Sequence, residues 1–219
     1  MIAGYVALAA LSIGLGFVVT KLVLSVGGIA RADTHVETWL ASHRSSGRTE
    51  ASLIGSIVAG GVVLPIVVAV ALVVFAIFRR WRIAVFVLVA LLVESGTYRA
   101  TTIFVHRHRP RVPRLEGLDP NASYPSGHTA ASIAVYVGLV LLLTSRVRNR
   151  AVRVVTWAIA VAIPPLVGLA RMYRGMHHPL DVVAGGLVGI AALVVVVFAA
   201  RAAGVAAERR HPHADADRA

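Results

Sequence analysis

The side chains best suited to acid–base and nucleophilic chemistry lie in one short polar segment, residues 173–181, between two long apolar runs. Ionisable groups beside a bilayer are costly, so such a segment is first interpreted as a functional site. If a helix begins at Pro179, His177 and Asp181 lie around its first turn. The carboxylate can then accept a hydrogen bond from one ring nitrogen of His177 and leave the other as a nucleophile. His178 is an alternative partner for Asp181.

By itself this segment would be interpreted as two interfacial histidines beside a helix-terminal aspartate, but a second polar segment, residues 123–128, supports a functional role. It contains Pro-Ser-Gly-His, which is expected to open a helix with Ser126 as its N-cap. Small residues such as Gly127 leave the first backbone N–H groups accessible, and the helix dipole makes them an anion site. His128 at the rim of that site can protonate a departing oxygen.

Two arginines complete a site for a phosphorylated substrate. Arg109, in a third polar segment at residues 105–111, and Arg171 carry permanently charged guanidinium groups that match the geometry of phosphate oxygens. The three segments together predict phosphoryl transfer, with a nucleophilic His177, an orienting Asp181, and a cradle of arginines and backbone amides.

The composition indicates that an integral membrane protein carries these segments. Of the 219 residues, 58% are hydrophobic, and the mean hydropathy is +0.78, well above the level of soluble domains. Cysteine is absent, which excludes disulfides and thiolate chemistry. The net charge of +12 comes from arginines in short loops, with Lys21 as the only lysine, and this leaves no soluble basic face for nucleic acid. The basic loops are expected to face lipid headgroups or a phosphorylated substrate.

Six apolar runs are long enough to cross a bilayer as helices, which predicts an all-α, polytopic membrane fold. A cleaved signal peptide is the alternative for the first run, but no positive charge precedes it and it is too long for the apolar region of such a peptide. Pro65 is expected to bend the second helix, and Pro164 and Pro165 the fifth. The runs cover residues 2–25, 51–78, 83–105, 126–144, 154–170 and 179–203.

The chain is therefore divided into three parts. Residues 1–50 are expected to form the first transmembrane helix and an amphipathic helix in the headgroup zone, with Trp39 as its anchor next to Val36 and Leu40. Residues 51–203 form the predicted catalytic core. The charged residues 204–219 are expected to be a disordered tail.

Two of the predicted helices must contact other helices. Gly185 and Gly189 give the last helix a face of small residues for close packing. The second half of the third helix is polar and must face protein rather than acyl chains, and its Glu94 is expected to pair with Arg99 or another arginine. The polar residues of that half are Glu94, Tyr98, Arg99, Thr101 and Thr102.

An even number of spans places both termini on one side of the membrane. The loops at residues 79–82 and 145–153 and the tail after residue 200 then share that side, with three, four and four arginines, which identifies it as cytoplasmic. The three polar segments lie together at the outer membrane interface. Their arginines run against the positive-inside rule, as expected if they bind a ligand.

The three segments resemble the signature of the type 2 phosphatidic acid phosphatase (PAP2) superfamily, which includes membrane lipid phosphatases and soluble vanadium haloperoxidases. That signature reads K-x6-R-P, then P-S-G-H, then S-R-x5-H-x3-D, and the resemblance covers roughly residues 50–203. The second part is complete in this chain. In the third part Arg171, His177 and Asp181 have the right spacing, which selects His177 over His178 as the nucleophile of the family.

The chain departs from the signature at two positions. Ala170 replaces the serine of the third part, and the Arg-Pro pair at residues 109–110 matches the first part, but Thr102 stands at its lysine. In the family this lysine helps to bind the phosphate. Arg99, one helical turn before Thr102, and Arg107, two residues before the Arg-Pro pair, are the candidates to supply the missing charge.

The resemblance implies a lipid phosphatase that needs no metal or cofactor. His177 would attack phosphorus, His128 would protonate the leaving group, and water would release phosphate from phosphohistidine. A polyprenyl pyrophosphate, such as undecaprenyl pyrophosphate in cell-wall recycling, is the favoured substrate, and phosphatidic acid and phosphatidylglycerophosphate are competitors. The expected partners are this substrate and membrane lipids.

Two other classes of function are open from the residues alone. A non-enzymatic transporter would also use intramembrane charges and kinked helices, although the sequence contains no inverted repeat. A metal-dependent hydrolase would gather ligands around zinc, although the dense arginines disfavour a dication. The candidate zinc ligands are His106, His108, His128, His177 and Asp181.

Overall fold

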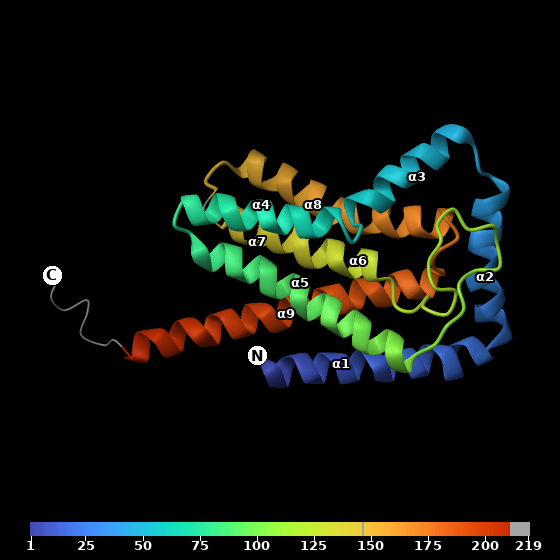
Figure 1. Cartoon of the computed structure of the whole chain (residues 1–219), viewed down its shortest axis with the longest axis horizontal. Helices are drawn as coiled ribbons and strands as arrows, with labels where there is room; N and C mark the ends of the chain where they lie inside the picture. The colour runs from blue at the N-terminus through green and yellow to red at the C-terminus, as the bar shows by residue number, and fades with distance from the viewer. Residues whose placement is uncertain (146, 211–219) are drawn as a thin grey trace, which may run out of the picture.

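Apolar helices lie side by side along the long axis of the molecule, and one amphipathic helix crosses an end of this bundle (Figure 1). The computed structural model describes residues 1–145 and 147–210. Its helices are α1 (Ile2–Phe17) with a π-helical turn (Val18–Leu22) and a 3₁₀ turn (Val23–Ser25), α2 (Gly27–Ser42), α3 (Ser46–Val58), α4 (Val63–Ile77), α5 (Trp81–Phe104), α6 (Gly127–Ser132) with a π-helical turn (Ile133–Val137), α7 (Gly138–Thr144), α8 (Arg150–Tyr173) and α9 (Pro179–Arg210).

The predicted spans agree with these helices. Among the described residues, five helices are long and apolar enough to cross a membrane, or six if the bent pair α3–α4 is counted as one span. The pair is bent by 46°, but the expected bend at Pro65 is wrong in position. The break lies at residues 59–62, which include Gly60 and Gly61. Pro65 lies in the first turn of α4, where its missing N–H costs no helical hydrogen bond.

The two last helices begin close to where the sequence predicts. Asn149 caps α8, its side-chain oxygen accepting from the Val152 backbone N–H at 3.2 Å, and α9 begins at Pro179. The expected disorder from residue 204 is wrong for residues 204–210, which continue α9 because this stretch is rich in alanine. Residues 211–219 lie outside the described residues.

The polar half of α5 faces the bundle, with one exception. Glu94 and Thr101 are buried, and the Thr101 hydroxyl lies 2.7 Å from that of Ser12 on α1. Arg99 is exposed, because five residues of helix place it about 140° around the axis from Glu94. The expected pairing of Glu94 with an arginine is also wrong: within the described residues its only hydrogen-bond donor is the Ser95 hydroxyl, at 3.1 Å.

Close packing of α9 against α6 confirms the predicted small-residue face. A Cβ atom on Gly185 would lie 2.4 Å from the Ser126 carbonyl oxygen, and one on Gly189 would lie 2.6 Å from the Ala130 carbonyl oxygen. The two backbones therefore approach more closely than any larger residue permits. This contact holds the start of α6 against the start of α9.

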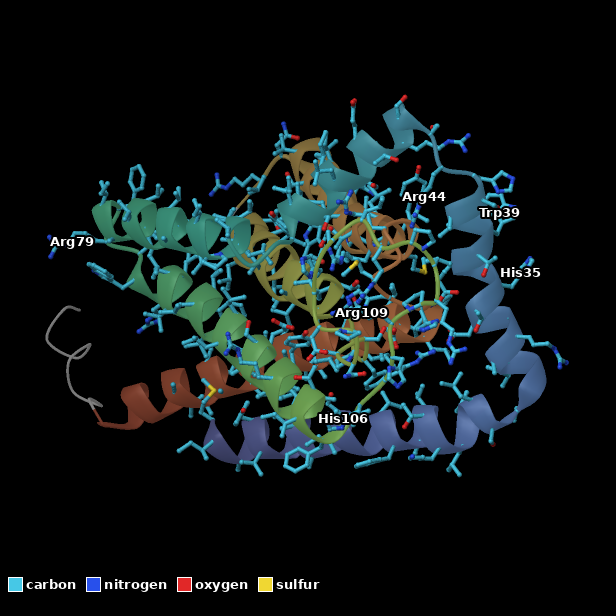
Figure 2. The ribbon with its side chains drawn as sticks, turned by 45° about the vertical axis from the view of Figure 1, so that its right-hand side comes forward. His35, Trp39, Arg44, Arg79, His106 and Arg109 are labelled. Atoms are coloured by element: carbon cyan, nitrogen blue, oxygen red, sulfur yellow. The ribbon has the colours of Figure 1, made fainter. Side chains whose placement is uncertain are left out.

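The amphipathic segment is confirmed as a helix, but its polarity differs from the prediction. Helix α2 crosses the end of the bundle at which α6 and α9 begin (Figure 1), while residues 46–50 already belong to α3. Trp39 is 52% exposed and points away from the bundle (Figure 2). The buried face of α2 consists of Asp33, Glu37 and Leu40, so two carboxylates point inward.

The contact between α6 and α9 gives a matched pair of substitutions. We expect Gly185→Ala to destabilise the protein by about 1–3 kcal/mol, because the new Cβ overlaps the Ser126 carbonyl oxygen. Gly186→Ala adds the same methyl group where no atom lies within 4 Å, and its better helix propensity should leave stability unchanged or raised. Unfolding by denaturant in detergent micelles measures both. Equal stabilities of the two variants would contradict the close packing.

Candidate active site

The three polar segments meet at the end of the bundle covered by α2 (Figure 1). The loop that follows α5 folds back on itself through backbone hydrogen bonds, with the Arg109 N–H donating to the Pro120 carbonyl at 2.8 Å and the Ser123 N–H to the Arg107 carbonyl at 3.0 Å. The Ser126 N–H donates to the Asp181 carbonyl at 2.9 Å, which ties the start of α6 to α9. Figure 2 shows Arg109 within this loop.

Along the extended backbone after α5, two arginine side chains are buried and two histidine side chains are exposed. Arg107 and Arg109 are buried, whereas His106 and His108 are exposed, as expected where successive side chains alternate in direction. Two of the four histidines proposed for a zinc site, His106 and His108, are therefore exposed and not gathered with His128 and His177. Among residues 1–145 and 147–210, no group of three His, Asp or Glu side chains is arranged to hold a metal ion.

His177 is buried and its ring is fixed by a backbone carbonyl. Its Nδ1 lies 2.7 Å from the Ser123 carbonyl oxygen, which can only accept, so Nδ1 carries the proton. Burial lowers the pKa of His177 well below 6.5, and the charges of Arg171, Arg109 and His128 lower it further. The ring is therefore neutral at physiological pH, and the lone pair on Nε2 is available as a nucleophile.

Asp181 supports His177 through Ser123 and not directly, which corrects the expected Asp–His hydrogen bond. Its Oδ2 lies 3.9 Å from His177 Nδ1 and instead accepts from the Ser123 hydroxyl at 2.6 Å and from the His178 backbone N–H at 2.9 Å. Its Oδ1 pairs with Arg107. The carboxylate thus holds the residue whose carbonyl orients the imidazole. The physical reason is that His177 precedes α9, so helical i,i+4 geometry does not apply to it.

The ring of His178 contacts α2 and the loop after α5, and not Ser123 as the ring of His177 does. Its Nδ1 pairs with Glu37 of α2, and its Nε2 lies 3.3 Å from the His108 carbonyl oxygen. Both ring nitrogens are therefore engaged with the covering helix and loop. Of the two adjacent histidines, only His177 has a ring nitrogen, Nε2, for which the described residues supply no partner.

Arg171 presents an unfilled site for an oxyanion. It is fully buried, and its Nη1 donates to the Ser56 hydroxyl at 2.5 Å and to Glu116 Oε2 at 2.6 Å. Its Nε and Nη2 have no hydrogen-bond partner within the described residues. These two N–H groups lie on one edge of the guanidinium, hereafter the open edge, and form the fork that binds two oxygens of a phosphate. Buried N–H groups left open in this way indicate a ligand.

Arg109 is fixed by backbone carbonyls close to the same point. Its Nη1 donates to the Met176 carbonyl at 2.5 Å, and its Nε to the Asp119 carbonyl at 2.7 Å. Met176 precedes His177 directly, so Arg109 is attached to the segment that carries His177. Its positive charge lies beside the ring without a carboxylate partner among the described residues.

The start of α6 carries the remaining predicted residues. Ser126 is the N-cap by position, but its hydroxyl lies 3.0 Å from that of Thr129 and caps no backbone N–H in the described structure. Gly127 packs closely against Tyr98, because a Cβ there would lie 3.0 Å from the ring. His128 is half-buried in the first turn of α6.

Neither candidate for the missing lysine charge is placed at the phosphate site. Arg99 is exposed on the outside of α5, and the Thr102 hydroxyl donates to its carbonyl at 3.0 Å. Arg107 uses one nitrogen for Asp181 and the other for Asp33 of α2. Arg107 is therefore a structural cation between two carboxylates, and the cationic groups around His177 are Arg109 and Arg171.

Sequence reasoning missed several residues that complete the site. Glu116, in the loop before α6, joins Arg171 to Arg174, whose Nε donates to Glu116 Oε1 at 2.5 Å. Partial burial by itself raises the pKa of Glu116, but the guanidinium groups of Arg171 and Arg174 outweigh it and hold the pKa at about 2. The only sequence signal was an acidic residue within an arginine-rich loop. The other missed residues are Asp33, Ser56, Tyr98 and Ser123.

Comparison with known proteins identifies a family profile that covers the three polar segments. The profile described as "PAP2 superfamily" matches residues 83–204. The chain is 37% identical over 75 residues to an undecaprenyl-diphosphatase of Sulfolobus acidocaldarius, and 33% identical over 79 residues to a probable diacylglycerol pyrophosphate phosphatase 1 of Schizosaccharomyces pombe. Each alignment covers 34% of this chain, but only 32% and 28% of these relatives, so the match spans about a third of their length.

Solved structures agree in fold. The first transmembrane PAP2-type phosphatidylglycerolphosphate phosphatase from Bacillus subtilis superposes with a TM-score of 0.73 and 21% identity, over 88% of this chain and 93% of that one. LpxE from Aquifex aeolicus superposes with a TM-score of 0.59 and 23% identity, over 74% of this chain and 93% of that one. At these identities the likeness concerns the all-α membrane fold alone.

The low pKa of Glu116 predicts how stability depends on pH. A carboxyl whose pKa falls from 4.5 to about 2 on folding stabilises the protein above its unfolded value, and this contribution is lost as the pH falls from 4.5 toward 2. We therefore expect Glu116→Gln to be less stable than the parent at pH 6, with the difference shrinking below pH 4.5. Thermal unfolding in detergent across this range measures it, with the exposed Glu50→Gln as control. A difference independent of pH would contradict the ion pairs.

Proposed function

Because the chain belongs to the PAP2 superfamily, we propose that it is a membrane lipid phosphatase that removes phosphate from a lipid phosphate or pyrophosphate through a phosphohistidine. One observation carries the proposal. The open edge of Arg171 is buried without a partner in the described structure, and Arg171 is near enough to His177 for its charge to lower the pKa of that ring, whose protonated Nδ1 is fixed on the Ser123 carbonyl. An oxyanion fork next to an oriented nucleophile is the arrangement that phosphoryl transfer requires.

In the first step the open edge of Arg171 binds two non-bridging oxygens, and Arg109 with the first N–H groups of α6 binds the phosphoryl group. Nε2 of His177 attacks phosphorus, and the bond to the leaving oxygen breaks. His128 donates a proton to that oxygen, so the lipid leaves as an alcohol or a monophosphate. The Nδ1–H of His177 stays on the Ser123 carbonyl, which stabilises the positive charge that develops on the ring.

In the second step water attacks the phosphohistidine. His128, now neutral, accepts a proton from that water, and the bond between phosphorus and Nε2 breaks to release inorganic phosphate. The same guanidinium groups face the developing charge in both steps. Every part of this cycle is supplied by residues of the site, and no step uses a metal ion.

A polyprenyl pyrophosphate is the proposed substrate. The two curated relatives are named for pyrophosphate lipids, an undecaprenyl diphosphate and a diacylglycerol pyrophosphate. The alternative is a phosphomonoester, phosphatidylglycerophosphate or phosphatidic acid, in keeping with the Bacillus subtilis phosphatase that shares the fold. Both classes present a terminal phosphate to the same arginines.

The proposed site faces the extracytoplasmic side of the cell membrane, with both termini in the cytoplasm. The site lies at the α2 end of the bundle, whereas the connections α4–α5 and α7–α8 lie at the opposite end (Figure 1). Those two connections span residues 78–80 and 145–149 and belong to the arginine-rich segments that the positive-inside rule assigns to the cytoplasm.

Phosphate release by purified protein tests the proposed function. In detergent micelles we expect release from a polyprenyl pyrophosphate, with kcat/KM at least about tenfold above that for phosphatidic acid and phosphatidylglycerophosphate, and no loss in EDTA. His177→Ala should lower kcat by at least about 10³-fold because it removes the nucleophile, while the exposed His106→Ala should not. A reversed order of substrates supports the phosphomonoester alternative. Wild-type protein that releases no phosphate, or loss of activity in EDTA, contradicts the proposal.

Replacing Arg171 tests the oxyanion fork. Arg171→Lys keeps a positive charge but removes the paired N–H groups of the open edge, so kcat/KM should fall about 10- to 100-fold. Arg99→Lys and Arg99→Ala should be neutral because this side chain is exposed. Steady-state kinetics on the preferred substrate measure all three. A large loss in Arg99→Ala would restore Arg99 as the replacement for the family lysine.

A further inference from the structure

The inward face of α2 carries two buried carboxylates from a part of the chain outside the matched family profile. Asp33 is 4% exposed and Glu37 is 1% exposed, although both lie on a helix at the surface of the bundle. Burying a carboxylate costs several kcal/mol unless cations and donors compensate it. The partners of the two side chains therefore show what α2 is bound to.

Asp33 contacts the active-site framework at three points, the weakest of which is His178 Nδ1, 3.8 Å from its Oδ2. Its Oδ2 forms an ion pair with Nη2 of Arg107, and its Oδ1 accepts from the Leu180 backbone N–H at 3.0 Å. Leu180 lies in the first turn of α9, where backbone N–H groups lack helical acceptors. One carboxylate of α2 thus holds both the start of α9 and the arginine of the loop after α5.

From Arg107 the contacts continue to the nucleophile. Nη1 of Arg107 pairs with Oδ1 of Asp181, and Oδ2 of Asp181 accepts from the Ser123 hydroxyl at 2.6 Å. The carbonyl of the same serine accepts from His177 Nδ1 at 2.7 Å. Every group in this series is buried, so each contact is poorly screened by solvent.

We propose that Asp33 is a positioning residue of the proposed phosphatase reaction, acting on His177 through Arg107, Asp181 and Ser123. This inference rests on the proposed function. Arg107 lies between two carboxylates, and each of them fixes one of its terminal nitrogens. Without the charge of Asp33, one side of Arg107 is unpaired, and the guanidinium is free to move away from Asp181. Ser123 and its carbonyl then lose their support, and the imidazole loses its orientation.

Glu37 provides the matched contrast. It lies one helical turn after Asp33 on the same helix face and is also buried, but its ion-pair partner is His178 and not Arg107; the same His178 Nδ1 lies 3.8 Å from Asp33 Oδ2. Glu37 therefore attaches α2 to the bundle, whereas Asp33 attaches α2 and is also connected to His177 through Arg107. The two contributions are separable by substitution.

The test compares Asp33→Asn with Glu37→Gln in the full-length protein. Asn keeps an oxygen for the Leu180 N–H but presents no charge to Arg107. We expect kcat to fall about 10- to 100-fold with KM within about twofold, because the nucleophile is misplaced while the phosphate cradle is intact. Glu37→Gln should lower the unfolding temperature but keep kcat within about twofold. Equal kcat losses in the two variants, or an unchanged kcat in Asp33→Asn, overturn the proposal.

Orthovanadate binding adds a readout that does not depend on turnover. Vanadate takes up a ring nitrogen as a fifth ligand, so its Kd reports the orientation of His177. We expect Asp33→Asn to raise this Kd about tenfold or more and Glu37→Gln to leave it unchanged. If wild-type protein binds vanadate and turns over substrate while Asp33→Asn does both equally well, only this inference fails. If wild-type protein does neither, the proposed function itself fails.

A double variant covers the case in which Asp33→Asn does not fold. Asp33→Asn/Arg107→Gln removes both charges of the pair, so it leaves no unpaired cation beside α2. We expect its kcat to be no lower than that of Arg107→Gln alone, because both changes interrupt the same series of contacts. Losses that multiply between the two single changes, or a double variant with the kcat of the wild type, overturn the proposal.

Discussion

The carboxylate of Asp181 is the contact on which the rest of the site depends. It is fully buried, and it is compensated by the Arg107 guanidinium, the Ser123 hydroxyl and the His178 backbone N–H. These partners come from the two loops that carry the polar segments. A buried charge is tolerated only when such partners surround it, so the folded state is possible only if the segments converge. The requirement that creates the site is therefore electrostatic.

Arg171, unlike Asp181, has polar groups that the surrounding residues leave without a partner. Glu116 and Ser56 satisfy one of its terminal nitrogens, and Glu116 also compensates Arg174. The open edge is left without an acceptor in the described structure, at a cost that folding alone gives no reason to retain. The site thus combines a fully compensated carboxylate with an arginine that is only partly compensated. In the proposed function the carboxylate fixes the geometry and the arginine binds the phosphate.

What the sequence could predict was local. The start of α9 at Pro179, the face formed by Gly185 and Gly189, and the choice of His177 follow from turn chemistry, periodicity and motif spacing. The contacts that complete the site could not be predicted from the sequence, because they join residues far apart in the chain. Ser56 and Arg171 are 115 residues apart, and Asp33 and Arg107 are 74 apart. Even the pair four residues apart, His177 and Asp181, was misjudged, because His177 lies before the helix and not within it.

The contribution of α2 and α3 changes how the chain is divided. By sequence, residues 1–50 look like an anchor in front of a catalytic core, and the family profile begins only at residue 83. Yet the compensation of Arg107, Arg171 and Arg174 comes partly from Asp33 on α2 and from serines on α3. If α2 and α3 moved away, these arginines would be left buried with fewer partners, at a cost of several kcal/mol for each unpaired ion. Helices α2 and α3 are therefore part of the electrostatic framework of the site, together with the loops that carry the polar segments.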